Sequence, residues 1–203
     1  MRIRGSRRLL FRRLTTFLLL LPCVAPALAY GQHGATTAVA GEKAVPEFAL
    51  RGQRDARAIK YGDWQKICFK TPGSAKVCRT TVSGRWETGQ SAVRIDLIER
   101  EGEQTARLQL FLPTGIYLQV APTLTVDQGE PAKIPYVWCL TNTCIASDRA
   151  DPALIHQMEN GKELKLEVAD TNLLSVSTTI PLAQFASVRA SAPSRTVEQD
   201  VDE

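Results

Sequence analysis

The sequence predicts an all-β fold, an antiparallel β-sandwich or open barrel with one short helix. Two disulfides are expected to cross-link this domain. Three observations lead to this prediction. Val93, Ile95 and Leu97 alternate with polar residues at the period of a strand rather than of a helix. Glycine, proline, asparagine and aspartate separate the short apolar runs at close intervals. Four cysteines form two close pairs behind an N-terminus that resembles an export signal.

The alternating runs define the expected strands. Residues 93–97 and 106–110 flank a polar turn that contains Gly102, so the two runs should pair as an antiparallel hairpin. Further strands are expected at residues 64–69, 77–82, 117–120, 124–126, 135–140, 144–146, 164–168 and 173–180. The one expected helix covers residues 153–159, with Asp151 as its cap, Pro152 at its first position and a left-handed stop at Asn160 and Gly161.

Residues 1–29 have the composition of a secretory signal peptide. Six arginines and no acidic residue precede an apolar run over residues 14–24, and Ala27 and Ala29 stand at the positions that define cleavage. The apolar run is shorter than the roughly 20 residues of a membrane-spanning helix, so no stable membrane insertion is expected after cleavage. Residues 6–11 also resemble a twin-arginine motif, which leaves both the Sec and the twin-arginine routes open. Pro22 argues against lipidation of Cys23.

The mature chain is expected to be slightly acidic. The whole chain carries a formal charge of +4, and removal of six arginines with no acidic residue lowers it to about −2. No cluster of basic residues remains, so nucleic acid is not expected as a partner. The predicted organisation is a signal peptide at 1–29, a disordered linker at 30–58, a β-sandwich domain at 59–190 and a flexible acidic tail at 191–203.

The cysteines are interpreted as structural disulfides. Setting Cys23 aside leaves Cys68, Cys78, Cys139 and Cys144, which allow three connectivities, and we expect the two local pairs, 68 with 78 and 139 with 144. Neither pair has the spacing of a zinc site or of a redox-active CxxC motif. The location that follows is the periplasm or the exterior of the cell, where disulfides persist.

The sequence shows no catalytic constellation. His33 falls in the expected linker and His156 on the expected helix, while Glu99, Glu101 and Glu103 flank a turn, where charges stay solvated. No catalytic residue, metal ligand or cofactor is therefore expected, and the protein is predicted not to be an enzyme.

The tryptophans offer the candidate contact residues. Trp64 and Trp138 lie near cysteines, so we expect both to pack beside a disulfide. Trp86, with Arg85, lies between Gly84 and Gly89 in what reads as a loop, where an aromatic side chain would be partly exposed and available to a partner.

Several short motifs occur in a characteristic order. They are Gly62-Asp63-Trp64 before Cys68 and Cys78, Leu112-Pro113-Thr114-Gly115-Ile116 with Leu118, Val126-Asp127-Gln128-Gly129, Tyr136 before Cys139, Cys144-Ile145-Ala146, Gly161, and Ile180-Pro181-Leu182 with Phe185. Over residues 60–190 this pattern resembles the invasion-associated locus B family. Thr143 and Gln184 stand where the family tends to have glycine, which affects loop geometry more than the fold.

The resemblance implies an exported protein of a Gram-negative bacterium. The founding member of the family is associated with entry into host cells, and no catalytic residues are defined for the family. The expected function is therefore non-enzymatic interaction with an unidentified protein or with a component of the envelope or host surface, which would support host-cell association. The alternative is a periplasmic module for a small ligand or glycan, or for envelope maintenance. A concave, aromatic-lined pocket between sheets would favour the alternative, and a flat patch with anchoring side chains would favour the first function. Partner identity and oligomeric state are left open by the sequence.

Overall fold

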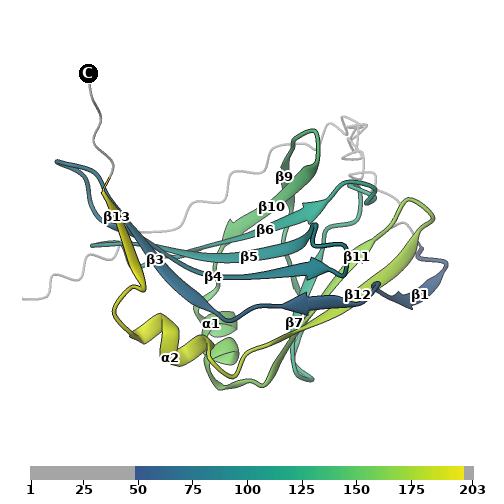
Figure 1. Ribbon diagram of the computed structural model, residues 1–203. Helices are drawn as coiled ribbons and strands as arrows, with labels where there is room; N and C mark the ends of the chain where they lie inside the picture. The colour runs from purple at the N-terminus through teal and green to yellow at the C-terminus, as the bar shows by residue number, and fades with distance from the viewer. Residues whose placement is uncertain (1–48, 199–203) are drawn as a thin grey trace, which may run out of the picture. The chain divides into compact units, whose positions relative to one another are not determined.

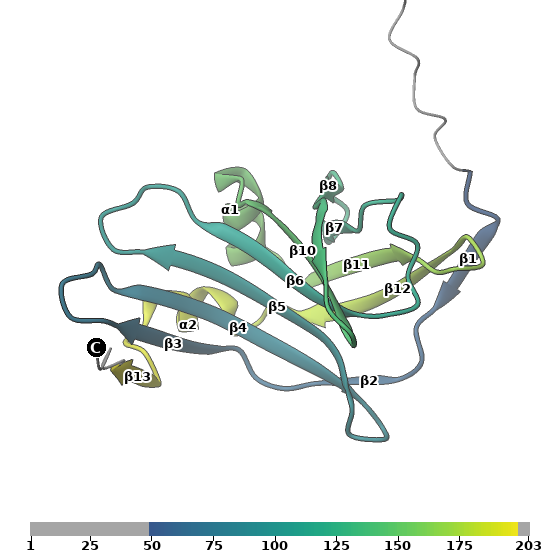
Figure 2. The same cartoon turned by 90° about the horizontal axis from the view of Figure 1, so that it is seen from above.

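The computed structural model describes residues 49–198, and these residues form two mixed β-sheets and two short helices (Figures 1 and 2). The elements are β1 (Gly52–Asp55), β2 (Ile59–Tyr61), β3 (Gln65–Lys70), β4 (Val77–Trp86), β5 (Ser91–Arg100), β6 (Arg107–Pro113), β7 (Thr123–Val126), β8 (Ala132–Lys133), β9 (Tyr136–Cys139), β10 (Thr143–Arg149), α1 (Pro152–Asn160), β11 (Glu163–Ala169), β12 (Leu174–Pro181), α2 (Phe185–Ala190) and β13 (Arg195–Glu198). The predicted sandwich-like fold is confirmed. The signal peptide, Cys23 and His33 lie outside the described residues.

The strand order differs between the two sheets. The five-stranded sheet runs β1-β12-β11-β7-β8, and the eight-stranded sheet runs β13-β3-β4-β5-β6-β10-β9, with β2 also paired to β4. The predicted hairpin is present as β5 and β6, in which Ile95 lies opposite Leu110 and Leu97 opposite Leu108. Most pairs are antiparallel as expected, but β1 pairs with β12 and β13 with β3 in parallel.

The core fills the space between the facing sides of the two sheets. Ile95, Leu97, Leu108 and Leu110 from the eight-stranded sheet belong to the same buried cluster as Leu124, Leu164, Leu166 and Ile180 from the five-stranded sheet. Each of these side chains contributes about 1.5–3 kcal/mol by leaving water. The alternation seen in the sequence therefore corresponds to one face packed inward on each sheet.

The two helices pack against each other, α1 against β7 and α2 against β3 and β4. Phe185 of α2 is fully buried and makes an edge-to-face contact with Trp64, with ring centroids 4.9 Å apart. The Trp64 indole nitrogen donates a hydrogen bond to the carbonyl of Pro181 at 2.8 Å. Trp64 thus joins the segment that leaves β12 to the start of β3.

The helix predictions are partly right. Asp151 caps α1 by accepting a hydrogen bond from the Ala153 amide at 2.8 Å, as expected. The left-handed stop is wrong, because Gly161 has an extended conformation with φ −82°. A side chain at Gly161 would collide with Val126, which explains the glycine by space rather than by backbone angle. The short helix α2 was not expected, since six residues carry too little periodicity to indicate it.

Both expected domain boundaries need correction. Strand β1 lies within the stretch predicted as a linker, and β13 lies within the predicted acidic tail. These strands are short, and their side chains are almost all exposed, so neither shows an apolar pattern. Their order comes from backbone pairing with distant edge strands. Residues 117–120 do not form the predicted strand, and only Ile116 bridges to Asp170 there.

The disulfides join Cys68 to Cys78 and Cys139 to Cys144, as predicted. Each pair lies directly opposite in register, the first between β3 and β4 and the second between β9 and β10. The Cα atoms of each pair are 4.0 Å apart. Both bonds therefore cross-link neighbouring strands rather than the two sheets.

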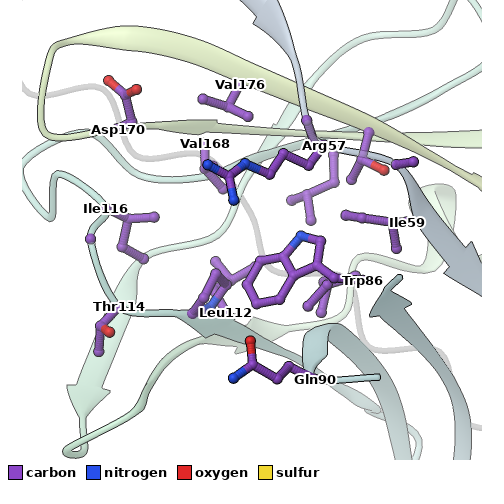
Figure 3. Close-up of a pocket in the computed structure, with 18 of the residues that line it drawn as sticks. Arg57, Ile59, Trp86, Gln90, Leu112, Thr114, Ile116, Val168, Asp170 and Val176 are labelled. Atoms are coloured by element: carbon purple, nitrogen blue, oxygen red, sulfur yellow. The ribbon is translucent and has the colours of Figure 1, made fainter. Parts of the chain in front are cut away.

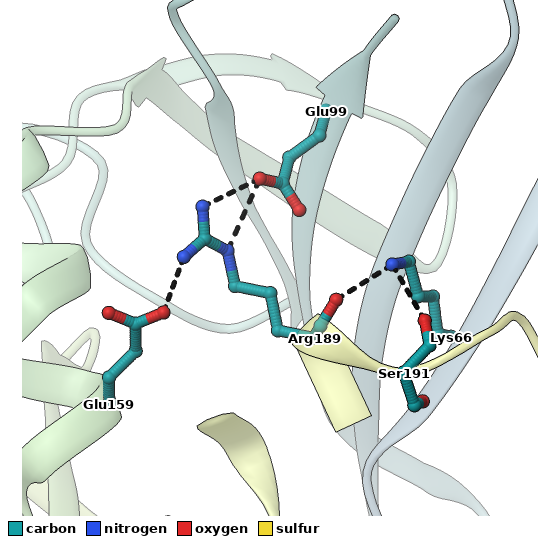
Figure 4. Close-up of polar contacts among 5 residues, drawn as sticks. All are labelled: Lys66, Glu99, Glu159, Arg189 and Ser191. Carbon is teal, nitrogen blue, oxygen red and sulfur yellow. Dashed lines mark hydrogen bonds and ion pairs between the residues drawn. The ribbon is translucent and has the colours of Figure 1, made fainter. Parts of the chain in front are cut away.

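Arg189 of α2 connects three elements (Figure 4). Its guanidinium donates hydrogen bonds to Glu99 of β5 at 2.7 and 3.2 Å and to Glu159 of α1. Burial alone would lower the pKa of Arg189, but the two carboxylates outweigh it and raise the pKa. The Lys66 ammonium donates to the carbonyls of Arg189 and Ser191, which fixes the end of α2 on β3. Within residues 49–198, neither helix is long and apolar enough to cross a bilayer.

A candidate binding cavity between the two sheets

A cavity of about 540 Å³ lies between the sheets and is bounded by residues from both. Val93 and Leu112 contribute from β5 and β6, and Leu166, Val168 and Val176 from β11 and β12. Val93, Leu112 and Leu166 belong both to the cavity lining and to the buried core cluster, and Figure 3 shows lining side chains facing one another across the gap. A space of this size, partly open to solvent and lined by apolar and polar side chains, is typical of small-molecule sites, whose volumes run from about 300 to 1,000 Å³.

Trp86 occupies one wall of this cavity. Strand β4 continues through Trp86 and pairs it with Ile59 of β2, so the predicted loop at residues 83–89 begins only after the tryptophan. The turn itself is present, because Gly89 has φ +82° and donates a hydrogen bond to the carbonyl of Trp86. The Trp86 ring is half-buried and points between the sheets.

Gly84 determines how β2 lies over β4. A Cβ atom at Gly84 would meet the side chain of Ile59, and it would come within 2.7 Å of the Tyr61 ring. The missing side chain therefore leaves room for both β2 residues to lie on the inner side of β4. Ile59, held in this way, becomes part of the cavity wall.

The chain crosses from one sheet to the other at residues 56–58. Before the crossover, β1 pairs with β12, and the Ala56 amide donates to the Ser177 carbonyl at 2.8 Å. After it, β2 pairs with β4 in the other sheet. The crossover borders the cavity, and the Arg57 side chain extends from it into the cavity (Figure 3).

The two arginines near the crossover differ in their partners. Arg54 forms an ion pair with Asp170, with Nη2 and Oδ2 3.1 Å apart. Arg57 makes no hydrogen bond or ion pair with any residue of the described range. The cavity thus has a guanidinium without a protein acceptor beside an apolar wall.

Asp170 is held as an anion by its surroundings. Its Oδ1 accepts hydrogen bonds from the amides of Leu174 and Asn172, at 3.0 and 2.9 Å. These bonds, that from Leu174 first, and the Arg54 guanidinium lower the pKa of Asp170 although burial opposes the shift. The carboxylate is therefore engaged in shaping the β11–β12 turn.

Tyr61 and Thr178 tie the two sheets together beside the cavity. Their hydroxyl oxygens lie 2.9 Å apart, in a hydrogen bond between β2 and β12. Burial raises the pKa of Tyr61 to about 12, and the bond to Thr178 only partly offsets it. The tyrosine is neutral at physiological pH and acts here as a link between sheets.

The two predicted contact residues, Trp86 and Arg85, point to different sides of β4. Trp86 faces the cavity, whereas Arg85 is exposed and donates a hydrogen bond to the Gly89 carbonyl at 2.9 Å. Their role in contacting a partner stays a prediction. Trp64 is buried against Phe185, and its packing beside a disulfide stays a prediction. The expected packing of Trp138 is wrong, since Trp138 is 66% exposed.

The exposed Trp138 belongs to an apolar hairpin at the edge of the eight-stranded sheet. Val137 is 59% exposed and Leu140 is 50% exposed, on either side of the tryptophan. Strand β9 is the last strand of its sheet within the described residues, so one of its edges has no strand neighbour there. Residues 136–144, which comprise β9, the turn and the start of β10, are called the edge hairpin below.

Sequence reasoning missed Arg57 and assigned no role to Ile59. Arg57 falls in the predicted linker, and Ile59 stands at the first position of the predicted domain. The alternation of Ile59, Lys60 and Tyr61 is a period-two signal, and its outer members are less exposed than Lys60. Three residues are too few to identify a strand from the pattern alone.

These features define a disulfide-linked β-sandwich domain with a cavity between its sheets, and disulfides of this kind indicate an extracytoplasmic protein. Residues 64–193 match the family model described as "Invasion associated locus B (IalB) protein", and the chain therefore belongs to the IalB family. A solved structure, the crystal structure of invasion associated protein B from Bartonella henselae, is 21% identical with a TM-score of 0.55. The likeness covers 64% of this chain and 90% of that chain, and it shows the fold. No curated protein matches the chain.

Proposed function

We propose that this chain is an exported, non-enzymatic binding protein that holds a small ligand between its two sheets. The observation that carries the proposal is the cavity of about 540 Å³ with Trp86 in its wall. A concave, aromatic-lined pocket is the feature that distinguishes a ligand-binding module from a protein that acts only through its surface. The geometry therefore favours the alternative function considered for the sequence, a periplasmic module that binds a small ligand.

The residues around the cavity support binding rather than catalysis. Of the described residues that line it, none is a serine, cysteine or histidine, and its hydroxyl groups are those of three threonines, Thr88, Thr114 and Thr178. Thr178 is bonded to Tyr61 and Thr88 to Gln90, while Asp170 is already occupied by backbone amides and Arg54. A nucleophile with a positioned base, the usual requirement for hydrolysis, is not assembled there. The non-enzymatic role is part of the proposal.

A neutral hydrophobic dye tests this function. N-phenyl-1-naphthylamine fluoresces more strongly in apolar surroundings, so its emission should rise on titration with the mature chain. Val176→Trp would fill the cavity and should weaken dye binding roughly tenfold or more, a loss of about 1.4 kcal/mol or more. The control is Val137→Trp, the same substitution on the exposed edge hairpin.

The control variant should bind the dye as the unchanged protein does. Circular dichroism and the thermal transition establish that both variants are folded. Absence of dye binding by the mature chain, or equal binding by the two variants, would show that the cavity is not a ligand site.

A second candidate function, interaction with a protein partner, is favoured by the edge hairpin. An exposed edge strand offers backbone donors and acceptors to an extended segment of another protein, and the neighbouring apolar side chains add contact area. Trp138 lies opposite Ile145 on β10, Ile145 lies opposite Phe111 on β6, and Phe111 lies opposite Arg94 on β5. The Arg94 guanidinium lies 3.6 Å from the Phe111 ring centroid. The partner expected here is a polypeptide strand with apolar side chains.

Site-specific crosslinking tests this second function. A photoreactive phenylalanine analogue at position 138, introduced in the native organism, should crosslink to a partner that is not captured from position 118. Leu118 is the control because it is also apolar and 46% exposed. The purified partner should bind the unchanged protein and lose affinity for Trp138→Ala. Identical crosslinking from the two positions would exclude the edge hairpin as a specific contact.

A further inference from the structure

We infer that the cavity takes an anionic amphiphile, a molecule with one apolar body and one negatively charged group, and that Arg57 binds the charged group. The inference rests on the proposed ligand-binding function and names its ligand class. It depends on three observations: the character of the walls, the state of Arg57, and the way the crossover holds that arginine at the cavity.

The walls indicate the apolar body. The apolar side chains that line the cavity come from both sheets, from β2 and from the segment after β6, and they are Ile59, Trp86, Val93, Leu112, Ile116, Leu166, Val168 and Val176. A ligand that covers these side chains gains roughly 25 cal/mol for each Å² of apolar surface removed from water. Polar side chains, among them Gln90 and Thr114, also line the cavity and can bond polar atoms of the ligand, but the apolar side chains form the larger part of its walls.

Arg57 indicates the charged group. Its guanidinium has no acceptor among the described residues, whereas the neighbouring Arg54 is paired with Asp170. A guanidinium can form two parallel hydrogen bonds with a carboxylate or a phosphate, and these charge-assisted bonds are stronger than hydrogen bonds between neutral groups. The absence of a protein partner leaves all of its donors available to a ligand.

The other charges near the cavity do not remove this preference. The negative charge of Asp170 is balanced by the ion pair with Arg54, and its Oδ1 already accepts hydrogen bonds from two backbone amides. Glu87 also borders the cavity, from the exposed turn after β4, and it forms no ion pair with Arg57. Of the two charged side chains that Figure 3 labels, Arg57 extends toward the cavity and Asp170 lies at its margin, so the electrostatic complement is an anion.

The crossover explains why the arginine stays at the cavity. Residues on both sides of Arg57 are hydrogen-bonded, Ala56 to the five-stranded sheet and the strand from Ile59 to the eight-stranded sheet. The backbone of Arg57 is therefore held at both ends, although its side chain is exposed. A ligand with its apolar part between the sheets would place its charged end next to this position.

The test compares ligands that share one chain and differ in their head group. Dodecanoate, dodecyl phosphate, dodecanol and dodecyltrimethylammonium, each below its micelle concentration, compete with N-phenyl-1-naphthylamine for the mature chain. The two anions should displace the dye at concentrations roughly tenfold lower than dodecanol, the factor expected for a single charge-assisted hydrogen-bonded pair. The cation should be the weakest competitor.

The variants assign the preference to one residue. Arg57→Gln should bring both anions to the level of dodecanol and leave dodecanol unchanged, and Arg57→Lys should restore part of the difference. Arg51→Gln is the matched control, because Arg51 is exposed nearby, lies outside the cavity lining and uses only its backbone amide in a hydrogen bond. It should behave as the unchanged protein does.

The outcomes separate the two proposals. If neither the dye nor any dodecyl compound binds, the ligand-binding function fails and this inference fails with it. If dodecanol and dodecanoate bind equally, or if Arg57→Gln weakens both alike, the cavity binds ligands but the head-group inference is wrong. A preference for phosphate over carboxylate would indicate a phospholipid-like source, and the reverse a fatty acid or another carboxylate.

Discussion

The Asp170 carboxylate holds the turn between β11 and β12, and its contribution to stability changes with pH. Leu173, between its two amide donors, has φ +61°, an uncommon angle for a leucine. The Asp170 carboxylate bonds to the amides on either side of that residue and to Arg54 of β1. The charge of this one group therefore supports both the β11–β12 turn and the attachment of β1.

The lowered pKa of Asp170 predicts a pH-dependent loss of stability. The folded-state pKa lies below the unfolded value of about 3.9, so the contribution is present above that value and is lost as the pH falls through the folded pKa. Asp170→Asn should be less stable than the unchanged protein at pH 7, and the difference should shrink below about pH 4. Urea unfolding at several pH values measures it.

The matched control for this measurement is Asp63→Asn. Asp63 is exposed and has no side-chain hydrogen bond or ion pair within residues 49–198. Its substitution should change stability little at either pH. A difference between Asp170→Asn and the unchanged protein that stays constant from pH 7 to pH 3 would contradict the assigned role.

At the scale of secondary-structure elements, the two disulfides support different kinds of hairpin. Cys68 is fully buried and Cys78 half-buried at the β3–β4 pair, whereas Cys139 is exposed on β9 and Cys144 is buried on β10. The first bond is part of the packed sheet. The second fixes the edge hairpin, whose Leu140 amide bonds to the Thr143 carbonyl at 2.7 Å.

Removal of each disulfide should therefore have a different effect. Chain-entropy arguments give about 2 kcal/mol for the sequence separation of 5 and about 3 kcal/mol for the separation of 10. Alanine at Cys68 and Cys78 should cost more than this entropy, because it also leaves space in the buried sheet. Alanine at Cys139 and Cys144 should cost about 2 kcal/mol plus a packing loss at Cys144 alone, because Cys139 is exposed, and it should speed hydrogen exchange at Leu140.

Denaturant unfolding of the two double variants and amide exchange of the second one measure these effects. A difference of about 1 kcal/mol or less, which the two loop lengths alone account for, would show that burial at Cys68 adds nothing to the cross-link. Unchanged exchange at Leu140 would show that the edge hairpin is ordered without its disulfide.

At the scale of the whole molecule, the predictable parts are those with strong local patterns. The alternation at residues 93–97, the cap at Asp151 and the close cysteine pairs each depend on neighbours in sequence, and each is present in the structure. The family resemblance over residues 60–190 agrees with the match at 64–193. These features were sufficient for the fold class.

The parts that could not be predicted depend on contacts between distant residues. Gly52 of β1 pairs with Leu174, and Arg195 of β13 pairs with Ile67. Neither strand has an apolar pattern from which it could be predicted. The cavity has the same origin, since its walls combine residues near 59, 86, 112 and 176. Trp86 was recognised as a candidate from its neighbouring glycines, but its direction depends on Ile59 and Gly84, which only the folded chain brings together.

The crossover at residues 56–58 can change in sequence without affecting the rest of the fold. It lies before residue 64, where the family match begins, and the apolar cluster of the sandwich does not include it. Substitutions there would alter the charge at the cavity while leaving both sheets intact. Proteins with this fold can therefore differ in the ligand that the cavity binds. A new ligand preference would require substitutions in this short connecting segment and no change in the hydrophobic core.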